Sequence, residues 1–546
     1  MRMKNCVGPC SSESVPAVTC LKSGILNSTT GECGGWTVAG RTFSDRLFSL
    51  MHKQGNSCRM RCIFSAALPA AAMAMILTML LAAPALAVTL PSIWADHMVL
   101  QQGKPITFRG TAEPGELVKV TIGETMKEVR ADSFGTWKLN MPVMQATFDA
   151  FEVTVAGEKS DPIVLRDVLV GEVWLGSGQS NMQWAVRDSN HPEQELAAAD
   201  HPSLRLFMVP LQASVYPQPT CNAEWKICSP ETVPNFSAVL YFFGRDLHKD
   251  LNVPVGLIAT SWGGTPCEAW TPEARVYTDP VTRPIVERWA DNPGLGEPWR
   301  PGGLYNGMIA PVLPYSLRGC IWYQGESNIG RARQHEKLFP TMIRSWRDAW
   351  NDDAMPFGFV QLAPFCYDRG QLENGGTIPC AELRESQRLT VENVPNTGMV
   401  VTTDIGNVDD IHPQNKQEVG RRMALWAEAK FYGKSDLVFS GPMFTTATPE
   451  AGKIRVSFRH ADGLKTADGV APSHFEVAGA DGKFVPATVV IDGQTVVASS
   501  DTVAHPVFVR FGYRDIAEPN LFNGAGLPAS PFTSDTTTPW LSEDGR

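Results

Sequence analysis

The chain has 546 residues, which is too long for a single hydrophobic core, so two or three domains are expected. Its 57 acidic and 47 basic residues give a net charge of −10, and no long basic run interrupts this balance. The charge therefore argues against nucleic acid as a partner.

The first recognisable feature is an apolar, alanine-rich segment that starts at Met60 and closes with an Ala-Leu-Ala site at residue 87. A flanking arginine on each side of Met60, the apolar run and the small residues at its end are typical of a secretory signal. No stop-transfer charges follow it, so we expect no membrane anchor after cleavage. We predict translation from Met60, a mature chain from about Val88, and a secreted or periplasmic location. Residues 1–87 then form no mature domain.

Six cysteines follow the signal segment, and an oxidising compartment permits disulfides among them. The pairs Cys221/Cys228 and Cys366/Cys380 each bracket a short loop, so we expect a bridge in each. The chain lacks the tandem cysteine spacing of a zinc site and the H-E-x-x-H run, so we predict neither a metal nor another cofactor.

The pattern of the mature chain changes twice. Residues 88–164 contain short β-rich runs separated by turn residues, which predicts a small antiparallel β-sandwich. Residues 165–434 alternate apolar strands with longer helical stretches, the pattern of a parallel sheet flanked by helices. The β pattern returns over residues 435–546. The two β-rich regions are either separate modules or halves of one sandwich that the middle domain interrupts.

The middle domain contains five candidate strands, and four of them end in an unusual polar or glycine-rich motif. In open α/β sheets, ligands bind beyond the carboxyl ends of the strands, so four motifs after parallel strands should meet at one rim. The candidate strands span residues 170–175, 255–260, 318–323, 357–362 and 398–403. Residues 340–350 have apolar positions at helical spacing, with Pro340 placed in the first turn of the predicted helix.

These motifs contain the parts of an acyl-transfer site. Ser180 follows a glycine-bearing strand-to-helix turn, which exposes its hydroxyl and leaves its N–H free. A serine hydroxyl needs a base in reach and a third group that orients the base. His412 precedes a proline at the start of a predicted helix over residues 414–429, and Asp409 lies three residues before it, within one tight turn. Ser180, His412 and Asp409 are therefore predicted to be nucleophile, base and orienting acid.

Four stretches of the chain together resemble the SGNH hydrolase superfamily, and within it the sialate O-acetylesterase-like carbohydrate esterases. These stretches are Asp167–Met182, Thr260–Trp270, Trp322–Asn328 and Asp409–Gly420. The resemblance extends before the catalytic domain and covers most of residues 88–435. It implies an α/β fold with a flavodoxin-like catalytic domain and the same assignment of nucleophile, base and acid.

The resemblance also implies an oxyanion hole made by the N–H of Ser180, the N–H of Gly264 and the side-chain amide of Gln324. Two alternatives stay open within these motifs. Gly263 could replace Gly264, and Asn328 could replace Gln324, because the superfamily usually has asparagine in the third motif. Losing one such donor should lower kcat by roughly 10²- to 10³-fold.

Other residues near the motifs have competing interpretations. Glu326 is a rival to Asp409 as the partner of His412, although a role in anchoring its loop is the simpler interpretation. Trp184, Trp262 and Trp270 border the motifs and could shape a pocket for a sugar or simply pack in the core.

The predicted function is a secreted carbohydrate O-acetylesterase that releases acetate from O-acetylated sugars without a cofactor. Its substrate would be an acetylated hemicellulose such as xyloglucan, or O-acetylated sialic acid. A glycan-binding protein without activity, and a lipase or arylesterase on the same fold, are the alternatives. The sequence leaves the oligomeric state open.

Overall fold

The computed structural model describes residues 87–291, 297–370 and 377–537. The predicted signal segment lies outside these ranges, apart from residue 87. Within them, no helix is both long enough and apolar enough to cross a membrane.

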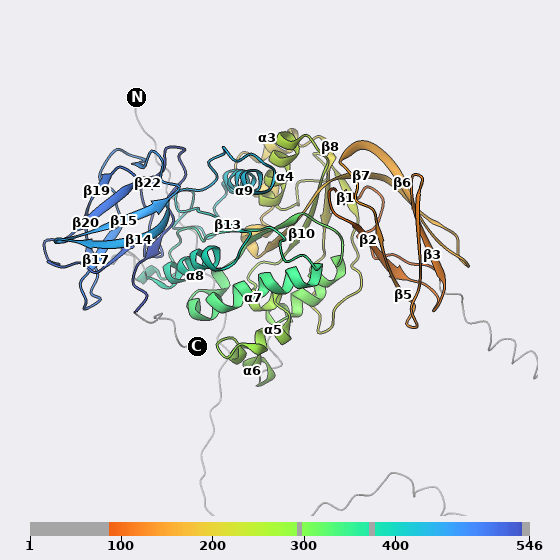
Figure 1. Ribbon diagram of the computed structural model, residues 1–546, viewed down its shortest axis with the longest axis horizontal. Helices are drawn as coiled ribbons and strands as arrows, with labels where there is room; N and C mark the ends of the chain where they lie inside the picture. Colours follow the sequence, from red (N-terminus) through yellow and green to blue (C-terminus); the bar gives the residue numbers. More distant parts are fainter. Residues whose placement is uncertain (1–86, 292–296, 371–376, 538–546) are drawn as a thin grey trace, which may run out of the picture. The chain divides into compact units, whose positions relative to one another are not determined.

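A parallel sheet forms the centre of the catalytic region (Figure 1), as the strand motifs predict. The five predicted strands lie side by side in the order β10-β7-β11-β12-β13, and all four pairings are parallel. Numbered along the chain, this is the order 2-1-3-4-5 of flavodoxin-like sheets. The strands are β7 (Ile163–Gly178), β10 (Val255–Ser261), β11 (Gly319–Tyr323), β12 (Phe357–Val360) and β13 (Thr397–Val400).

Two further strands, which the sequence did not indicate, extend this sheet beyond β10. β8 (His201–Met208) pairs with β10 in parallel, and β9 (Trp225–Cys228) pairs antiparallel with β8 at the edge. Neither shows the long apolar run of the central strands, and β9, at the edge of the sheet, has only four residues, two of them buried.

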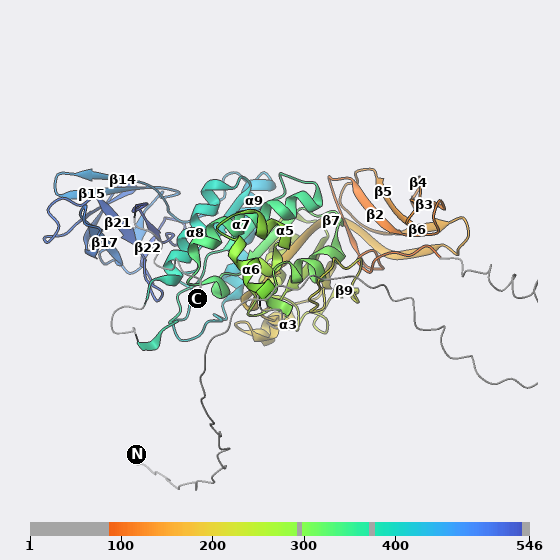
Figure 2. The same cartoon turned by 90° about the horizontal axis from the view of Figure 1, so that it is seen from below.

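Helices cover both faces of the sheet, and the alternation of side chains along β7 divides the core accordingly. Trp174 packs in the cluster that contains apolar residues of α4 (Ala238–Leu251) and α9 (Lys416–Phe431). Leu175 belongs to the other cluster, with apolar residues of α7 (Ala332–Trp350). Figure 2 shows α7 next to α5 and α8. The remaining helices are α2 (Ser180–Gln183), α3 (Pro192–Ala197), α5 (Glu273–Thr278), α6 (Arg283–Asp291) and α8 (Pro379–Asn393).

Two of the predicted helices begin at other residues than the sequence indicated. Pro340 lies inside α7, which begins eight residues earlier, because the apolar face of the helix already starts at Ala332 and Leu338. α9 starts two residues later than predicted, where the Asn415 side chain accepts a hydrogen bond from the Glu418 N–H and caps the helix. The 3₁₀ turns are Val186–Asp188, Cys267–Trp270, Glu297–Trp299, Ala310–Val312 and Glu326–Asn328, and Tyr305–Ile309 is a π-helical turn.

The N-terminal strands form two small sheets, one of which continues into the central sheet. The first half of β7 pairs antiparallel with β6, and its second half pairs in parallel with β10 and β11. The predicted boundary at residue 164 therefore falls inside one continuous strand. The strands are β1 (Val99–Gln101), β2 (Ile106–Thr111), β3 (Leu117–Ile122), β4 (Thr125–Arg130), β5 (Thr136–Met141) and β6 (Thr147–Gly157), with β2 paired to β5 and β3 to β4 and β6.

The C-terminal strands form two four-stranded sheets and a two-stranded ribbon that share a core of their own. The apolar run at residues 437–439 predicts a further strand of this region, but the chain forms a bend and irregular backbone there. The sheets have the orders β14-β15-β20-β19 and β18-β17-β21-β23. The strands are β14 (Met443–Glu450), β15 (Lys453–Arg459), β16 (Lys465–Thr466), β17 (Phe475–Ala478), β18 (Val485–Pro486), β19 (Thr488–Asp492), β20 (Thr495–Ser499), β21 (Phe508–Phe511), β22 (Leu521–Phe522) and β23 (Phe532–Thr533).

The predicted disulfides are wrong, since all six cysteines among the described residues are free thiols. Cys228 is the last residue of the extended strand β9 and Cys221 lies before that strand, and their sulfurs contact the Ala199 carbonyl and Ser92 respectively. The backbone N–H of Cys366 bonds to Val408, whereas that of Cys380 bonds to the Asp515 carboxylate. Burial raises the pKa of the Cys228 thiol to about 12.

Candidate active site

Ser180 lies at the carboxyl end of the central strand β7, as the first residue of α2. The turn that presents it requires glycine at Gly178, whose φ is +140°. A Cβ atom there would lie 2.2 Å from the carbonyl oxygen of Tyr323 on the neighbouring strand β11. The close approach of β7 and β11 at the rim thus positions the serine, as expected for a ligand site in this type of sheet.

The structure brings His412 to Ser180, with 2.8 Å between the imidazole Nε2 and the serine Oγ. His412 comes from the segment between β13 and α9, more than two hundred residues along the chain. The Trp184 indole stacks on the imidazole, with ring centroids 5.0 Å apart and an interplanar angle of 19°. A serine hydroxyl bonded to an imidazole has the geometry of a nucleophile with its base.

The surroundings of His412 favour the neutral imidazole that a base requires. Burial lowers the pKa of His412, the Lys416 ammonium lowers it further, and the Asp410 carboxylate opposes both effects. Asp410 also accepts a hydrogen bond of 2.9 Å from the backbone N–H of His412. At neutral pH the imidazole can therefore take the serine proton.

Asp409, the predicted acid, is not brought to the imidazole in this structure. Its side chain is 73% exposed, and its Oδ1 lies 3.3 Å from Arg369 Nη1. The turn instead directs Asp410, one residue later, toward the backbone of His412. The structure therefore joins nucleophile and base and leaves the predicted orienting acid at the surface.

Replacing Asp409 by asparagine measures what this carboxylate contributes. Where an aspartate bonds the catalytic imidazole, such a change lowers kcat by about 10⁴-fold. Because Asp409 is exposed and paired with Arg369, we expect a loss of about tenfold or less in steady-state kinetics with an aryl acetate. A loss near 10⁴-fold would show that Asp409 turns inward and bonds His412 during the reaction.

Two of the predicted oxyanion-hole donors are backbone N–H groups without a hydrogen-bond partner among the described residues. The N–H of Ser180 begins α2, where a helix offers no internal partner. Gly264 has a φ of +74°, and its N–H has no hydrogen-bond partner among the described residues. The N–H of Gly263, in contrast, donates to Gln183 Oε1 at 2.8 Å. Of the two glycines that the sequence left open, Gly264 is therefore the one with a free donor.

The amide of Gln324, the third predicted donor, is already engaged. Gln324 is fully buried, and its Nε2 donates to Asn328 Oδ1 at 2.7 Å and to the Thr265 carbonyl at 3.3 Å. The backbone N–H of Cys267 donates a hydrogen bond to Asn328 Oδ1. This contact fixes which end of the Asn328 amide is the oxygen. Asn328 in turn donates its Nδ2 to Glu268. In this structure both amides hold the loop that contains Gly264, and neither offers a donor to Ser180.

Sequence reasoning missed two polar residues beneath the site, Asn181 and Lys416. Asn181 is 1% exposed and bonds Glu326, Lys416 and the carbonyl of Ile411, the residue before His412. Both residues lie inside the motifs that indicate the family. Burial beside the site is what sets these two residues apart from the other polar residues of the motifs. A single sequence does not show which polar residues are buried.

The cavity in front of Ser180 has a volume of about 540 Å³ and a mixed lining. Trp184, Met208 and Leu211 provide apolar surface, while Arg187 bonds Asn235 on the same wall. Of the predicted aromatic residues, Trp184 lines this cavity, Trp270 is fully buried in the core, and Trp262 is partly buried. Trp299, which lies outside the sequence motifs, is 47% exposed, and its indole N–H donates to the Gly264 carbonyl at 2.6 Å.

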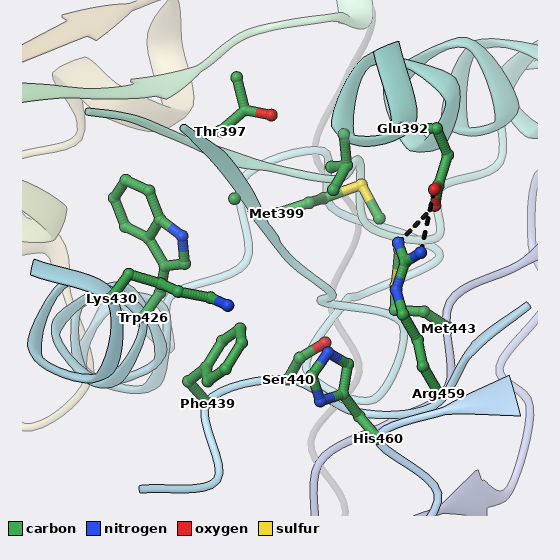
Figure 3. A pocket seen from close by; sticks show the side chains of 12 residues that line it. Glu392, Thr397, Met399, Trp426, Lys430, Phe439, Ser440, Met443, Arg459 and His460 are labelled. Carbon is green, nitrogen blue, oxygen red and sulfur yellow. Dashed lines mark hydrogen bonds and ion pairs between the residues drawn. The ribbon is translucent and has the colours of Figure 1, made fainter. Parts of the chain in front are cut away.

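A second cavity of about 280 Å³ lies elsewhere, between the catalytic region and the C-terminal strands (Figure 3). Arg459 of β15 and Glu392 of α8 form an ion pair there, and the Lys430 ammonium lies 4.5 Å from the Phe439 ring centroid. Thr397 at the amino end of β13 also lines it, so this cavity is at the opposite edge of the sheet from Ser180. It is not part of the Ser180 site.

No group of three histidine, cysteine or acidic side chains that could hold a metal ion is found in the described parts of the chain. The site has a serine hydroxyl hydrogen-bonded to an imidazole at the rim of a parallel sheet. Enzymes that transfer acyl groups through a serine ester use groups of this kind.

Comparisons with known proteins agree with this arrangement. The family model of carbohydrate esterases, sialic acid-specific acetylesterases, matches residues 170–427. The sialate O-acetylesterase of Mus musculus is 31% identical over 64% of this chain and 74% of its own length. The Homo sapiens sialate O-acetylesterase is 32% identical over 64% of this chain and 72% of its own. The crystal structure of a carbohydrate acetylesterase from Xanthomonas citri is 39% identical, covers 82% of this chain and all of its own, and superposes with a TM-score of 0.74.

Two of the residues that the family resemblance singles out, Ser180 and His412, are in contact at the rim of the sheet, and the match covers 74% and 72% of the length of two relatives above 30% identity. The chain belongs to the sialate O-acetylesterase-like carbohydrate esterases and is a carboxylic ester hydrolase.

Proposed function

We propose that this esterase is a secreted enzyme that removes acetyl groups from O-acetylated sugars, with Ser180 as nucleophile and His412 as general base. The observation that carries the proposal is the 2.8 Å contact between Ser180 Oγ and His412 Nε2 at the mouth of the cavity. Its secretion rests on the signal pattern of residues 60–87. No metal or organic cofactor is part of the proposal.

The reaction proceeds in two steps. Ser180 Oγ attacks the acetyl carbonyl carbon while His412 takes the hydroxyl proton, and the negative oxygen that forms faces the N–H groups of Ser180 and Gly264. The tetrahedral intermediate collapses, the bond to the sugar oxygen breaks, and His412 returns the proton to that oxygen. Water, deprotonated by His412, then attacks the acetyl-serine, which releases acetate and restores the hydroxyl.

The substrate is an O-acetylated carbohydrate, either a hemicellulose such as xyloglucan or O-acetylated sialic acid. The similar proteins support an O-acetylated carbohydrate, since the mammalian relatives are named for sialate and the Xanthomonas citri structure for carbohydrate in general. The cavity, at about 540 Å³, has room for a sugar ring in front of the serine.

Acyl-chain length tests the proposal against a lipase or arylesterase on the same fold. We expect kcat/KM to fall by at least about tenfold from acetyl to butyryl and further to octanoyl esters of one alcohol, because the family acts on acetyl groups. Acetate release from acetylated xyloglucan oligosaccharides and from O-acetylated sialic acid, measured side by side, then identifies the sugar. Equal rates for acetyl and octanoyl esters would contradict an acetylesterase, and tight glycan binding without acetate release would favour a binding protein.

A further inference from the structure

A buried lysine lies directly under the site, in a position that is unfavourable for a cation. Lys416 is the first residue of α9 and is 1% exposed. The start of a helix carries partial positive charge, so a cation there is destabilising, and burial adds a desolvation cost. A lysine at this position therefore needs compensating contacts, and the structure shows which ones it has.

The ammonium of Lys416 donates to Asn181 Oδ1 at 2.5 Å and lies over two aromatic rings. Its distance is 5.8 Å to the Trp184 centroid and 5.4 Å to the Tyr323 centroid. Trp184 is the ring that stacks on His412. Trp184 therefore contacts both the Lys416 ammonium and the His412 imidazole.

Asn181 connects the lysine to the backbone of the histidine segment. Lysine can only donate, so the amide oxygen must face it and the amide nitrogen must face the acceptors. Asn181 Nδ2 donates to Glu326 Oε1 at 2.6 Å and to the Ile411 carbonyl at 2.9 Å. The peptide unit after Ile411 leads into His412. One side chain, adjacent to Ser180, therefore fixes the approach of the base.

We propose that Lys416, Asn181 and Glu326 form a positioning network that holds His412 against Ser180, in place of an acid bonded to the imidazole. The inference rests on the proposed serine reaction. It explains why a nucleophile–base contact of 2.8 Å persists although Asp409 faces solvent. Asn181 fixes the backbone of the segment, and Lys416 and Trp184 fix the plane of the imidazole.

The network also acts on the charge of the base. The groups that face His412 are Lys416 from α9, which lowers its pKa, and Asp410 from its own loop, which raises it. Burial lowers the pKa of Lys416 itself to about 7, and the charges of Glu326 and Asp410 partly oppose this. Below that pH Lys416 is a cation, and its charge disfavours the protonated form of the imidazole.

Two substitutions separate the positioning effect from the charge effect. Asn181→Ala cuts the link to Ile411 without changing a charge, so kcat should fall about 10- to 100-fold while the acid limb of kcat/KM stays in place. Lys416→Met removes the cation as well, so kcat should fall by a similar factor and the acid limb should move to higher pH. Lys416→Arg keeps the cation, and its acid limb should stay near that of the unchanged enzyme.

The measurement is the pH profile of kcat and kcat/KM with an aryl acetate, with Tm recorded for each variant. Lys430→Met is the matched control, since Lys430 is an exposed lysine near the other end of the same helix. If Lys416→Met does not fold, the kcat of Asn181→Ala and the acid limb of Lys416→Arg test the proposal. A kcat within about threefold of the unchanged enzyme for Asn181→Ala, or an unshifted acid limb in folded Lys416→Met, would overturn the proposal. Full activity in Ser180→Ala would instead refute the serine reaction itself.

Discussion

Ser180→Ala should lower kcat for acetyl ester hydrolysis by about 10⁴- to 10⁶-fold, the largest effect of any single change in this protein. In the proposed mechanism the variant lacks the atom that forms the acetyl-enzyme, while the N–H groups of residue 180 and Gly264 remain as the proposed oxyanion donors. KM should change little because the cavity keeps its lining. Steady-state kinetics on the full chain measure the effect.

Ser133→Ala is the control for this variant, since Ser133 is an exposed serine in the N-terminal region. It should have the activity of the unchanged enzyme. The Tm of Ser180→Ala should stay within a few degrees of that enzyme, because Ser180 is part of the site and not of the apolar core. A retained rate in a folded Ser180→Ala variant would show that another group attacks the ester.

His412→Gln should reduce kcat nearly as strongly, by about 10⁴- to 10⁶-fold, because nucleophile and base act as a unit. The unchanged enzyme carries the complementary signature in its pH profile. The imidazole works only when neutral, so kcat/KM is lost as the pH falls through its pKa. Burial and Lys416 hold this pKa below the ordinary value of 6.5, so the midpoint of the acid limb should lie below 6.5.

His505→Gln, a change at an exposed histidine of the C-terminal region, serves as the control for His412→Gln and should leave the pH profile unchanged. An acid-limb midpoint above 6.5 would mean that the base is stabilised as a cation, contrary to its contacts in this structure. High activity in His412→Gln would mean that the serine has another base.

The sequence predicts the parts of this protein that follow from local pattern. The five central strands appear as apolar runs, and the polar motifs after them lie at one rim because parallel strands end at the same edge. Ser180 and His412 were predicted as partners and are in contact. The strands β8 and β9 and the start of α7 were missed, since their apolar positions are too few or extend across a proline.

The finer assignments depend on contacts that no local pattern contains. Asp409 and Asp410 are equivalent in sequence, and only the path of the turn decides which one approaches His412. Gly263 and Gly264 differ through the Gln183 side chain, which lies some eighty residues earlier. The disulfide prediction used spacing alone, whereas the sulfurs of the first pair contact different groups and the backbones of the second pair have different hydrogen-bond partners.

The most direct test of the central claim is to locate the acetyl group on the enzyme. The full-length enzyme would be mixed with an acetyl ester, quenched in acid within the first turnovers, digested and examined by mass spectrometry. The account predicts one acetyl group on the peptide that contains Ser180, and none on that peptide in Ser180→Ala. Acetate release with the acetyl group on a different residue would contradict it.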